Sequence, residues 1–137
     1  MSTPTDLKSL GNEAFRFKNY DKAISYYTQA LDLDSKDSIF TNNLLLSDRS
    51  KLFSNRSACH SIKGNFELAL EDAEESTRLN HKFAKGYTRK GHACLQLKLY
   101  KESVKAYRRA HQLEPESEPI KAYLEEANQQ LTKHEEI

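Results

Sequence analysis

Five hydrogen-bond donors in this chain have the types and the spacing needed to hold carboxylates. Lys8 and Asn12 are four residues apart, as are Lys85 and Arg89, and Asn55 lies between the two pairs. Residues four apart lie on one face of a helix, so each pair presents its donors together. Ammonium, guanidinium and amide groups all donate to a carboxylate. A chain that ends in an acidic residue has two carboxylates close together, one on the side chain and one at the terminus, and these would suit such a set.

The elements that would position these donors follow from an internal repeat. An aromatic residue is followed three positions later by a small one in three places, which are Tyr20/Ala23, Phe66/Ala69 and Tyr100/Ser103. The second and third places are 34 residues apart, and the first and second are separated by 12 residues more than that. Helical spacing of apolar residues runs through nearly the whole chain, and strand signals are absent.

A 34-residue helix–turn–helix period resembles the tetratricopeptide repeat. The segments that carry the resemblance are LGNEAFRFKNYDKAISYYTQALDLDS, RSACHSIKGNFELALEDAEESTRLNH and KGHACLQLKLYKESVKAYRRAHQLEP. The second departs most, with Ser57 in place of glycine, His60 in place of an aromatic residue and His81 in place of the closing proline. The resemblance implies an all-α fold of seven helices, in which three helix pairs and a capping helix form a right-handed superhelical array. Within one domain, 1–137, the expected units are repeat one at 4–37, an insertion at 38–49, repeat two at 50–83, repeat three at 84–117 and a capping helix at 118–134.

The ends of the array and the insertion have their own signals. Thr3, Pro4 and Asp6 form a capping pattern for the first helix. At the other end, Ser117 and Pro119 offer a helix start, after which Ile120, Tyr123, Leu124, Ala127 and Leu131 keep one apolar face. For the insertion, one interpretation is a loose loop. We favour longer flanking helices, with Leu45, Arg49, Leu52 and Phe53 on an extended third helix, because a long structureless loop is uncommon in a compact domain.

In such an array the first helix of each pair lines the concave surface. The five donors would therefore form one band across the first, third and fifth helices, with Lys8 and Arg89 expected to be exposed. The insertion precedes the helix of Asn55 and could shift it relative to Asn12.

The runs LKSLGNEAF, FSNRSAC and AKGYTRKG resemble the dicarboxylate clamp of co-chaperone tetratricopeptide domains, in which Lys8, Asn12, Asn55, Lys85 and Arg89 all have counterparts. This resemblance implies binding of the Glu-Glu-Val-Asp tail of cytosolic heat-shock protein 90 or heat-shock protein 70. It also implies a cytoplasmic interaction module, with no enzymatic activity and no cofactor or metal. We expect a monomer.

Beyond the band, the tail's aliphatic residue would need apolar walls, and Phe15, Ala58 and Ile62 are candidates for a shallow pocket. Phe15 and Ile62 could equally serve only to pack between helices.

Composition limits the alternatives. The net charge is +1, with 21 basic and 20 acidic side chains, so bulk attraction to nucleic acid or an anionic membrane is not expected. No apolar run is long enough to span a bilayer.

Cys59 and Cys94 fall in helical patterns and are expected to be reduced and buried. The five histidines are dispersed and form no metal motif, and His60 is expected between helices. Two other functions stay open, a scaffold that binds through its convex face or insertion, and nucleic-acid binding through the basic third repeat.

Overall fold

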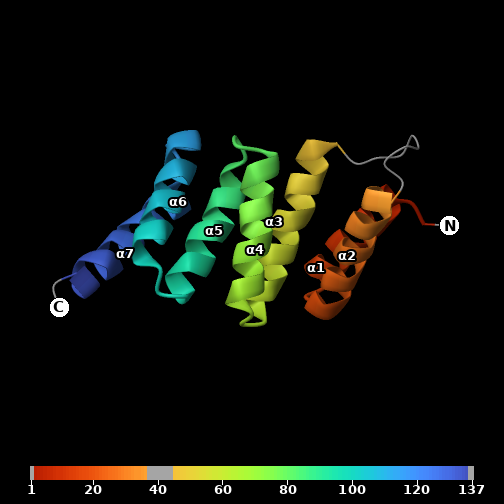
Figure 1. The fold of residues 1–137 in the computed structure, drawn as a ribbon, viewed down its shortest axis with the longest axis horizontal. Helices are drawn as coiled ribbons and strands as arrows, with labels where there is room; N and C mark the ends of the chain where they lie inside the picture. The colour runs from red at the N-terminus through yellow and green to blue at the C-terminus, as the bar shows by residue number, and fades with distance from the viewer. Residues whose placement is uncertain (1, 37–44, 136–137) are drawn as a thin grey trace.

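The computed structural model describes residues 2–36 and 45–135, and within them the chain forms seven helices and no strands. This confirms the predicted all-α fold. The helices are α1 (Pro4–Arg16), α2 (Tyr20–Lys36), α3 (Leu46–Ile62), α4 (Phe66–Leu79), α5 (Ala84–Gln96), α6 (Tyr100–Leu113) and α7 (Glu118–Glu135). They follow one another in a row from the N-terminal to the C-terminal end of the molecule (Figure 1). Each helix contacts the next, and α3 also contacts α5.

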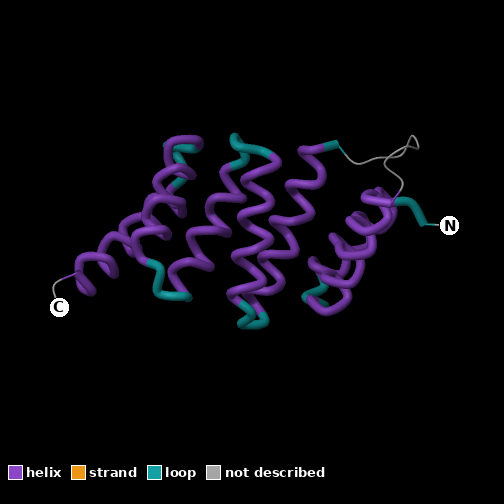
Figure 2. Tube along the Cα trace, in the orientation of Figure 1, coloured by secondary structure: helices purple, strands orange, loops and turns teal. Residues whose placement is uncertain are grey.

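The turns inside the three helix pairs share one backbone geometry (Figure 2). The amide N–H groups of Asn19, Asn65 and Leu99 each donate to the carbonyl oxygen five residues earlier. The N···O distance is 2.8 Å in all three turns. Such a bond closes a helix through a residue with positive φ. That residue is Gly64 in the middle turn but Lys18 and Lys98 in the others, where φ is 61° and 64°. The turn is therefore imposed by the packing of the helix pairs even where the sequence has no glycine.

Close helix crossings explain both the small residues and one departure from the repeat pattern. A Cβ atom at Gly11 would lie 2.6 Å from the ring of Tyr27, and one at Gly91 would lie 2.7 Å from the ring of Tyr107. In the middle pair this glycine is Ser57, and the residue that corresponds to the tyrosine is Ala73. The larger serine is thus accommodated by a smaller partner, and its hydroxyl donates to the Ala69 carbonyl at 2.7 Å.

A buried ion pair joins the second, third and fourth helices. Arg56 donates to both carboxylate oxygens of Asp72 at 2.8 Å and to the Thr28 hydroxyl at 3.0 Å. Nε2 of His60 lies 3.6 Å from the same carboxylate. The expected interhelical position of His60 is confirmed, and burial lowers its pKa.

Both ends of the helical row are closed as the sequence predicts. Thr3 and Asp6 form a reciprocal capping box at the start of α1. Helix α7 begins at Glu118, and the Ser117 hydroxyl accepts from the Ile120 amide. Ala127 packs with Val104 and Tyr107, and the half-buried Leu95, Leu124 and Leu131 surround them. Helix α7 therefore covers the apolar side of α6 that would otherwise face water.

The insertion is partly absorbed into longer helices, which confirms the favoured interpretation. Helices α2 and α3 each have 17 residues, against 14 in α4 and 13 in α5. Leu45 was expected on the extended helix but is its N-cap, directly before α3, and is 69% exposed, while Leu52 is fully buried. Residues 37–44, which include most of the predicted insertion, lie outside the described part of the chain. The extension places an additional helical turn, with Asp48, ahead of Asn55.

Candidate carboxylate-binding site

Asn12 and Asn55 meet directly across the boundary between the first two helix pairs. Nδ2 of Asn55 donates to Oδ1 of Asn12 at 3.1 Å, so the insertion does not move these side chains apart. The Tyr27 hydroxyl donates to the same oxygen at 2.6 Å. Burial raises the pKa of Tyr27 to about 12, which keeps this hydroxyl protonated and able to donate. Because the amide oxygen of Asn12 already accepts twice, its NH₂ group is the end left to donate to a ligand.

Lys8 lies one helical turn before Asn12 on α1 and is only partly exposed. Its Nζ lies 3.2 Å from Oδ1 of Asp48, and the two side chains are 26% and 28% exposed. The expectation that Lys8 is exposed in the empty site was wrong. The reason is the lengthened α3, whose first turn brings Asp48 alongside α1.

Lys85 and Arg89 lie one turn apart on α5 and differ in their surroundings. Lys85 is exposed, whereas Arg89 is half-buried, so the expectation of an exposed Arg89 was also wrong. Burial lowers the pKa of the Arg89 guanidinium, and nearby Tyr123 and Cys59 oppose that shift. An arginine in such surroundings stays charged at neutral pH. Its Nε is buried and has no hydrogen-bond partner among the described residues. A buried cationic donor without a partner is costly.

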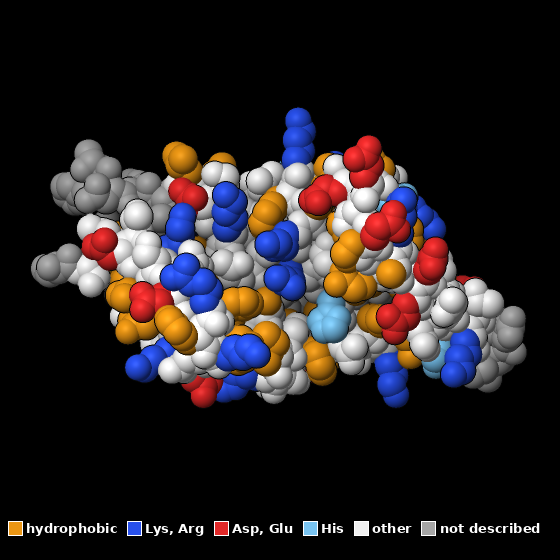
Figure 3. Space-filling model, turned by 180° about the vertical axis from the view of Figure 1, so that it is seen from behind, with side chains coloured by type: hydrophobic (Ala, Val, Ile, Leu, Met, Phe, Trp, Pro, Cys, Tyr) orange, Lys and Arg blue, Asp and Glu red, His pale blue; other side chains and the backbone are white. Residues whose placement is uncertain are grey.

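The five side chains come from α1, α3 and α5, which alternate with α2, α4 and α6 along the chain. We call Lys8, Asn12, Asn55, Lys85 and Arg89 together the donor band. Seen from the side opposite to Figure 1, lysine and arginine side chains gather over the middle of the molecule beside hydrophobic ones (Figure 3). The band offers ammonium, amide and guanidinium donors, and its chemistry is noncovalent binding of anions.

The three candidate pocket residues have different environments. Phe15 packs against the core of the first helix pair and contacts the ring of Tyr20 edge to face, with centroids 5.7 Å apart. Ala58 is buried, and Ile62 is 53% exposed. Of the three, Ile62 is the side chain most accessible to a ligand.

Two residues at the site were not singled out from the sequence. Asp48 lies within the insertion and pairs with Lys8 across 40 positions, a separation at which a single sequence gives no signal. Tyr27 was assigned only a packing role by its place in the repeat. Its spacing from Gly11 indicates the ring contact, but the reach of its hydroxyl to Asn12 depends on how α1 and α2 cross.

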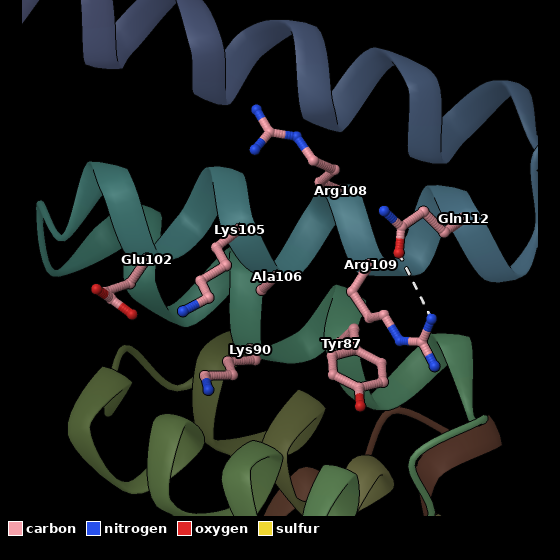
Figure 4. Close-up of a pocket in the computed structure, with 8 residues that line it drawn as sticks. All are labelled: Tyr87, Lys90, Glu102, Lys105, Ala106, Arg108, Arg109 and Gln112. Atoms are coloured by element: carbon pink, nitrogen blue, oxygen red, sulfur yellow. Dashed lines mark hydrogen bonds between the residues drawn. The ribbon is translucent and has the colours of Figure 1, made fainter.

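A separate basic hollow of about 400 Å³ lies between α5 and α6, close to α4 (Figure 4). Tyr87 and Lys90 line it from α5, on the opposite side of that helix from Lys85 and Arg89, since successive residues are about 100° apart. Arg109 stacks over the Tyr87 ring, 5.8 Å from its centroid, and donates to the His81 carbonyl. The positive charge of the third pair is therefore divided between two faces.

The reactive side chains outside the donor band include two cysteines. Both cysteines are free and buried, as expected, and burial raises the pKa of each thiol to about 11. Within residues 2–36 and 45–135, no three His, Cys, Asp or Glu side chains are grouped to hold a metal ion. None of the described helices has both the length and the apolar character needed to cross a membrane.

Known proteins with this sequence pattern and fold identify the family. Two tetratricopeptide repeat models match the chain, one at residues 84–117 and one at residues 4–37. The crystal structure of the Sgt2 tetratricopeptide domain from Aspergillus fumigatus is 31% identical, with a TM-score of 0.81, and the match covers 98% of this chain and 82% of that one. The chain belongs to the tetratricopeptide repeat family.

Two further relatives of this tetratricopeptide domain are chaperone-associated. Heat shock protein Sti1 of Saccharomyces cerevisiae is 35% identical over 126 residues, which are 92% of this chain and 20% of Sti1. The first tetratricopeptide domain of Spaghetti (RPAP3), bound to the HSP90 peptide SRMEEVD, is 28% identical with a TM-score of 0.81, and the match covers 95% of this chain and 96% of that one. The chain spans about a third or less of the length of the curated relatives that it matches first.

Proposed function

We propose that this domain binds the acidic C-terminal Glu-Glu-Val-Asp tail of heat-shock protein 90, heat-shock protein 70 or both through a dicarboxylate clamp. The observation that carries the proposal is the shared Oδ1 of Asn12. Its two protein donors, Tyr27 and Asn55, leave the Asn12 NH₂ group as a fixed donor between Lys8 and the second helix pair. Fixed amide donors flanked by cations are suited to a carboxylate.

In this proposal the donor band holds two carboxylates. Lys8, Asn12 and Asn55 bind the terminal carboxylate of the tail. Lys85 and Arg89 bind the neighbouring side-chain carboxylate. The Spaghetti (RPAP3) domain, a relative bound to a peptide that ends in Glu-Glu-Val-Asp, supports this choice of ligand.

The expected affinity is moderate. Charge-assisted hydrogen bonds contribute about 1.5–3 kcal/mol each. Ordering a flexible peptide and bringing two molecules together cost at least several kcal/mol. The remainder corresponds to a dissociation constant of roughly micromolar, about −8 kcal/mol. The domain would therefore dock and release chaperone tails reversibly.

The proposed role is that of an adaptor in a cytoplasmic co-chaperone, without chemistry of its own. Residues 50–83 would form the second repeat between the two that match the family models, residues 38–49 the insertion and residues 118–134 the cap. We propose that the domain acts as a monomer, with other parts of a longer protein supplying any further activity.

Calorimetry with three peptides tests the proposal. The probes are Met-Glu-Glu-Val-Asp as the free acid, its C-terminally amidated form, and Pro-Thr-Ile-Glu-Glu-Val-Asp. We expect the amidated peptide to bind at least tenfold more weakly, because it lacks the terminal carboxylate. Equal binding of the acid and the amide would refute the clamp. Comparison of the two free acids would show which chaperone is preferred.

Substitutions in the donor band extend this test. Lys8→Ala or Arg89→Ala should weaken binding of the free acid by about 1.5–3 kcal/mol. Thermal stability should change little in Lys8→Ala, because the Lys8 ion pair is partly exposed, and should fall modestly in Arg89→Ala, because that half-buried side chain also packs. Arg108→Ala, an exposed arginine on α6, is the matched control and should bind normally. Unchanged binding in both band variants would favour a scaffold that uses another surface.

The basic hollow beside α6 carries the alternative of nucleic-acid binding. Binding of an oligonucleotide through phosphates would weaken steeply with salt. We do not favour it, because the exposed residues of the adjacent α4 include Glu67, Glu71 and Glu74, which would repel a phosphate backbone.

A further inference from the structure

The donor band has an acidic neighbour that belongs to the chain itself. Asp48 accepts from Nζ of Lys8 at 3.2 Å, and both side chains are roughly three-quarters buried. Asp48 lies in the first turn of α3. This helix begins at Leu46, four residues before the predicted start of repeat two at position 50. The pairing is therefore a product of the lengthened helix and is separate from the contacts that hold Asn12 and Asn55 together.

We propose that Asp48 limits the affinity of the donor band by competing with the ligand carboxylate for Lys8. This inference rests on the proposed clamp. In the free domain the Asp48 carboxylate occupies a position beside the ammonium group that a terminal carboxylate would need. An incoming carboxylate must displace Asp48 or share Lys8 with it, and two carboxylates at one ammonium repel each other.

A second carboxylate in the ligand can compensate for this competition. A ligand with a single carboxylate gains one contact with Lys8, and this contact alone must offset the free energy lost when Asp48 is displaced. A tail with a second carboxylate also gains contacts with Lys85 and Arg89, which have no ion-pair partner among the described residues. Asp48 thus lowers affinity by a similar factor for every ligand whose carboxylate uses Lys8, and a ligand that fills the whole donor band keeps enough affinity to bind.

A merely structural role for Asp48 leads to a different expectation. An acidic residue in the first turn of a helix stabilises it through the helix dipole, and a partly exposed ion pair adds little more. Removal of the charge would then lower stability slightly and leave peptide affinity unchanged, or lower it if Asp48 held Lys8 in a productive orientation. The sign of the change in affinity therefore separates the two roles.

The experiment is a double-mutant cycle measured by calorimetry at low salt. Wild type, Asp48→Asn, Lys8→Ala and the double variant are titrated with Met-Glu-Glu-Val-Asp and with its amidated form. We expect Asp48→Asn to bind the free acid about three- to fivefold more tightly than wild type, and this gain to disappear in the Lys8→Ala background. The gain should also shrink as salt is raised, because screening weakens the competing pair.

Asp21→Asn is the charge-matched control. Asp21 pairs with Lys63 on another part of the surface, so this variant removes one negative charge without changing the surroundings of Lys8. An equal gain from Asp21→Asn would overturn the proposal, because it would show a general effect of net charge. Asparagine at position 48 keeps the shape of the side chain, and melting curves of all variants show that they are folded.

The outcomes distinguish the inference from the function on which it rests. If wild type prefers the free acid to the amide but Asp48→Asn binds equally or more weakly, the competition is refuted and the clamp stands. If neither protein distinguishes acid from amide, the clamp and the competition both fail. A gain that persists without Lys8 would also overturn the assignment of Lys8 as the contested group.

Discussion

At the scale of single residues, the contact between Gly91 and Tyr107 leaves no room for a side chain. An added Cβ would lie 2.7 Å from Cδ1 of a tyrosine ring that is 2% exposed. Overpacking of this kind costs about 1–3 kcal/mol, and the better helix propensity of alanine recovers up to about 1 kcal/mol. We expect Gly91→Ala to lower the free energy of unfolding by about 1–2 kcal/mol, measured by urea denaturation.

The middle helix pair suggests the control. There, Ser57 and Ala73 stand where the third pair has Gly91 and Tyr107, so a larger residue on one helix accompanies a smaller one on the other. Gly91→Ala should therefore cost less in a Tyr107→Ala background than in wild type. Equal costs in both backgrounds would mean that the ring contact is not the cause.

The donor band shows how far the sequence determines the site. Spacing places Lys8 with Asn12 and Lys85 with Arg89, because positions four apart share a helix face whatever the tertiary structure. The longer α3 was predicted from the sequence, but the pairing of Lys8 with Asp48 also depends on how α3 packs against α1, which the sequence around either residue does not show. The surroundings of Arg89 likewise include Tyr123 of α7, which lies 34 positions later in the chain.

At the scale of elements, the capping box should control the start of α1. The Thr3 hydroxyl accepts from the Asp6 amide at 3.1 Å, and Asp6 accepts from the Thr3 amide at 3.0 Å. We expect Thr3→Ala to destabilise the domain by about 1 kcal/mol, since loss of a side-chain cap typically costs this much. Hydrogen exchange should be faster in the first turn of α1 and unchanged in α6. Ser2→Ala, one position earlier and exposed, should have no effect.

The helices themselves could be predicted because their signals agree. Apolar periodicity, the capping pattern at Thr3 and the prolines near each end all indicate the same boundaries. The turns were less accessible, because the left-handed backbone at Lys18 and Lys98 carries no residue signal, and only Gly64 is the expected type. The helix crossings impose this left-handed conformation on the two lysines. It can be predicted only by comparing their turns with the turn at Gly64.

At the scale of the whole molecule, the C-terminal helix should be essential for stability. Helix α7 covers Val104 and Tyr107 and buries its own Ile120. Each large apolar side chain exposed to water costs about 1.5–3 kcal/mol. A chain that ends at residue 117 should therefore lose at least about 3 kcal/mol of stability in urea denaturation. Truncation after Glu135 is the control, and an equally stable shorter chain would show that α6 needs no cover.

Each of the two buried thiols can be used to detect the opening of the helix pair to which it belongs. Cys59 belongs to α3 and Cys94 to α5, both are nearly inaccessible, and burial raises the pKa of both thiols to about 11. The thiolate is the form that reacts with a thiol reagent, and burial disfavours it. Each sulfur therefore reacts only after its surroundings open to water. In a linear array whose units are stabilised by their neighbours, these openings need not be simultaneous. The relative rates of labelling at Cys59 and Cys94 would therefore show from which end the array unravels, without any probe being introduced.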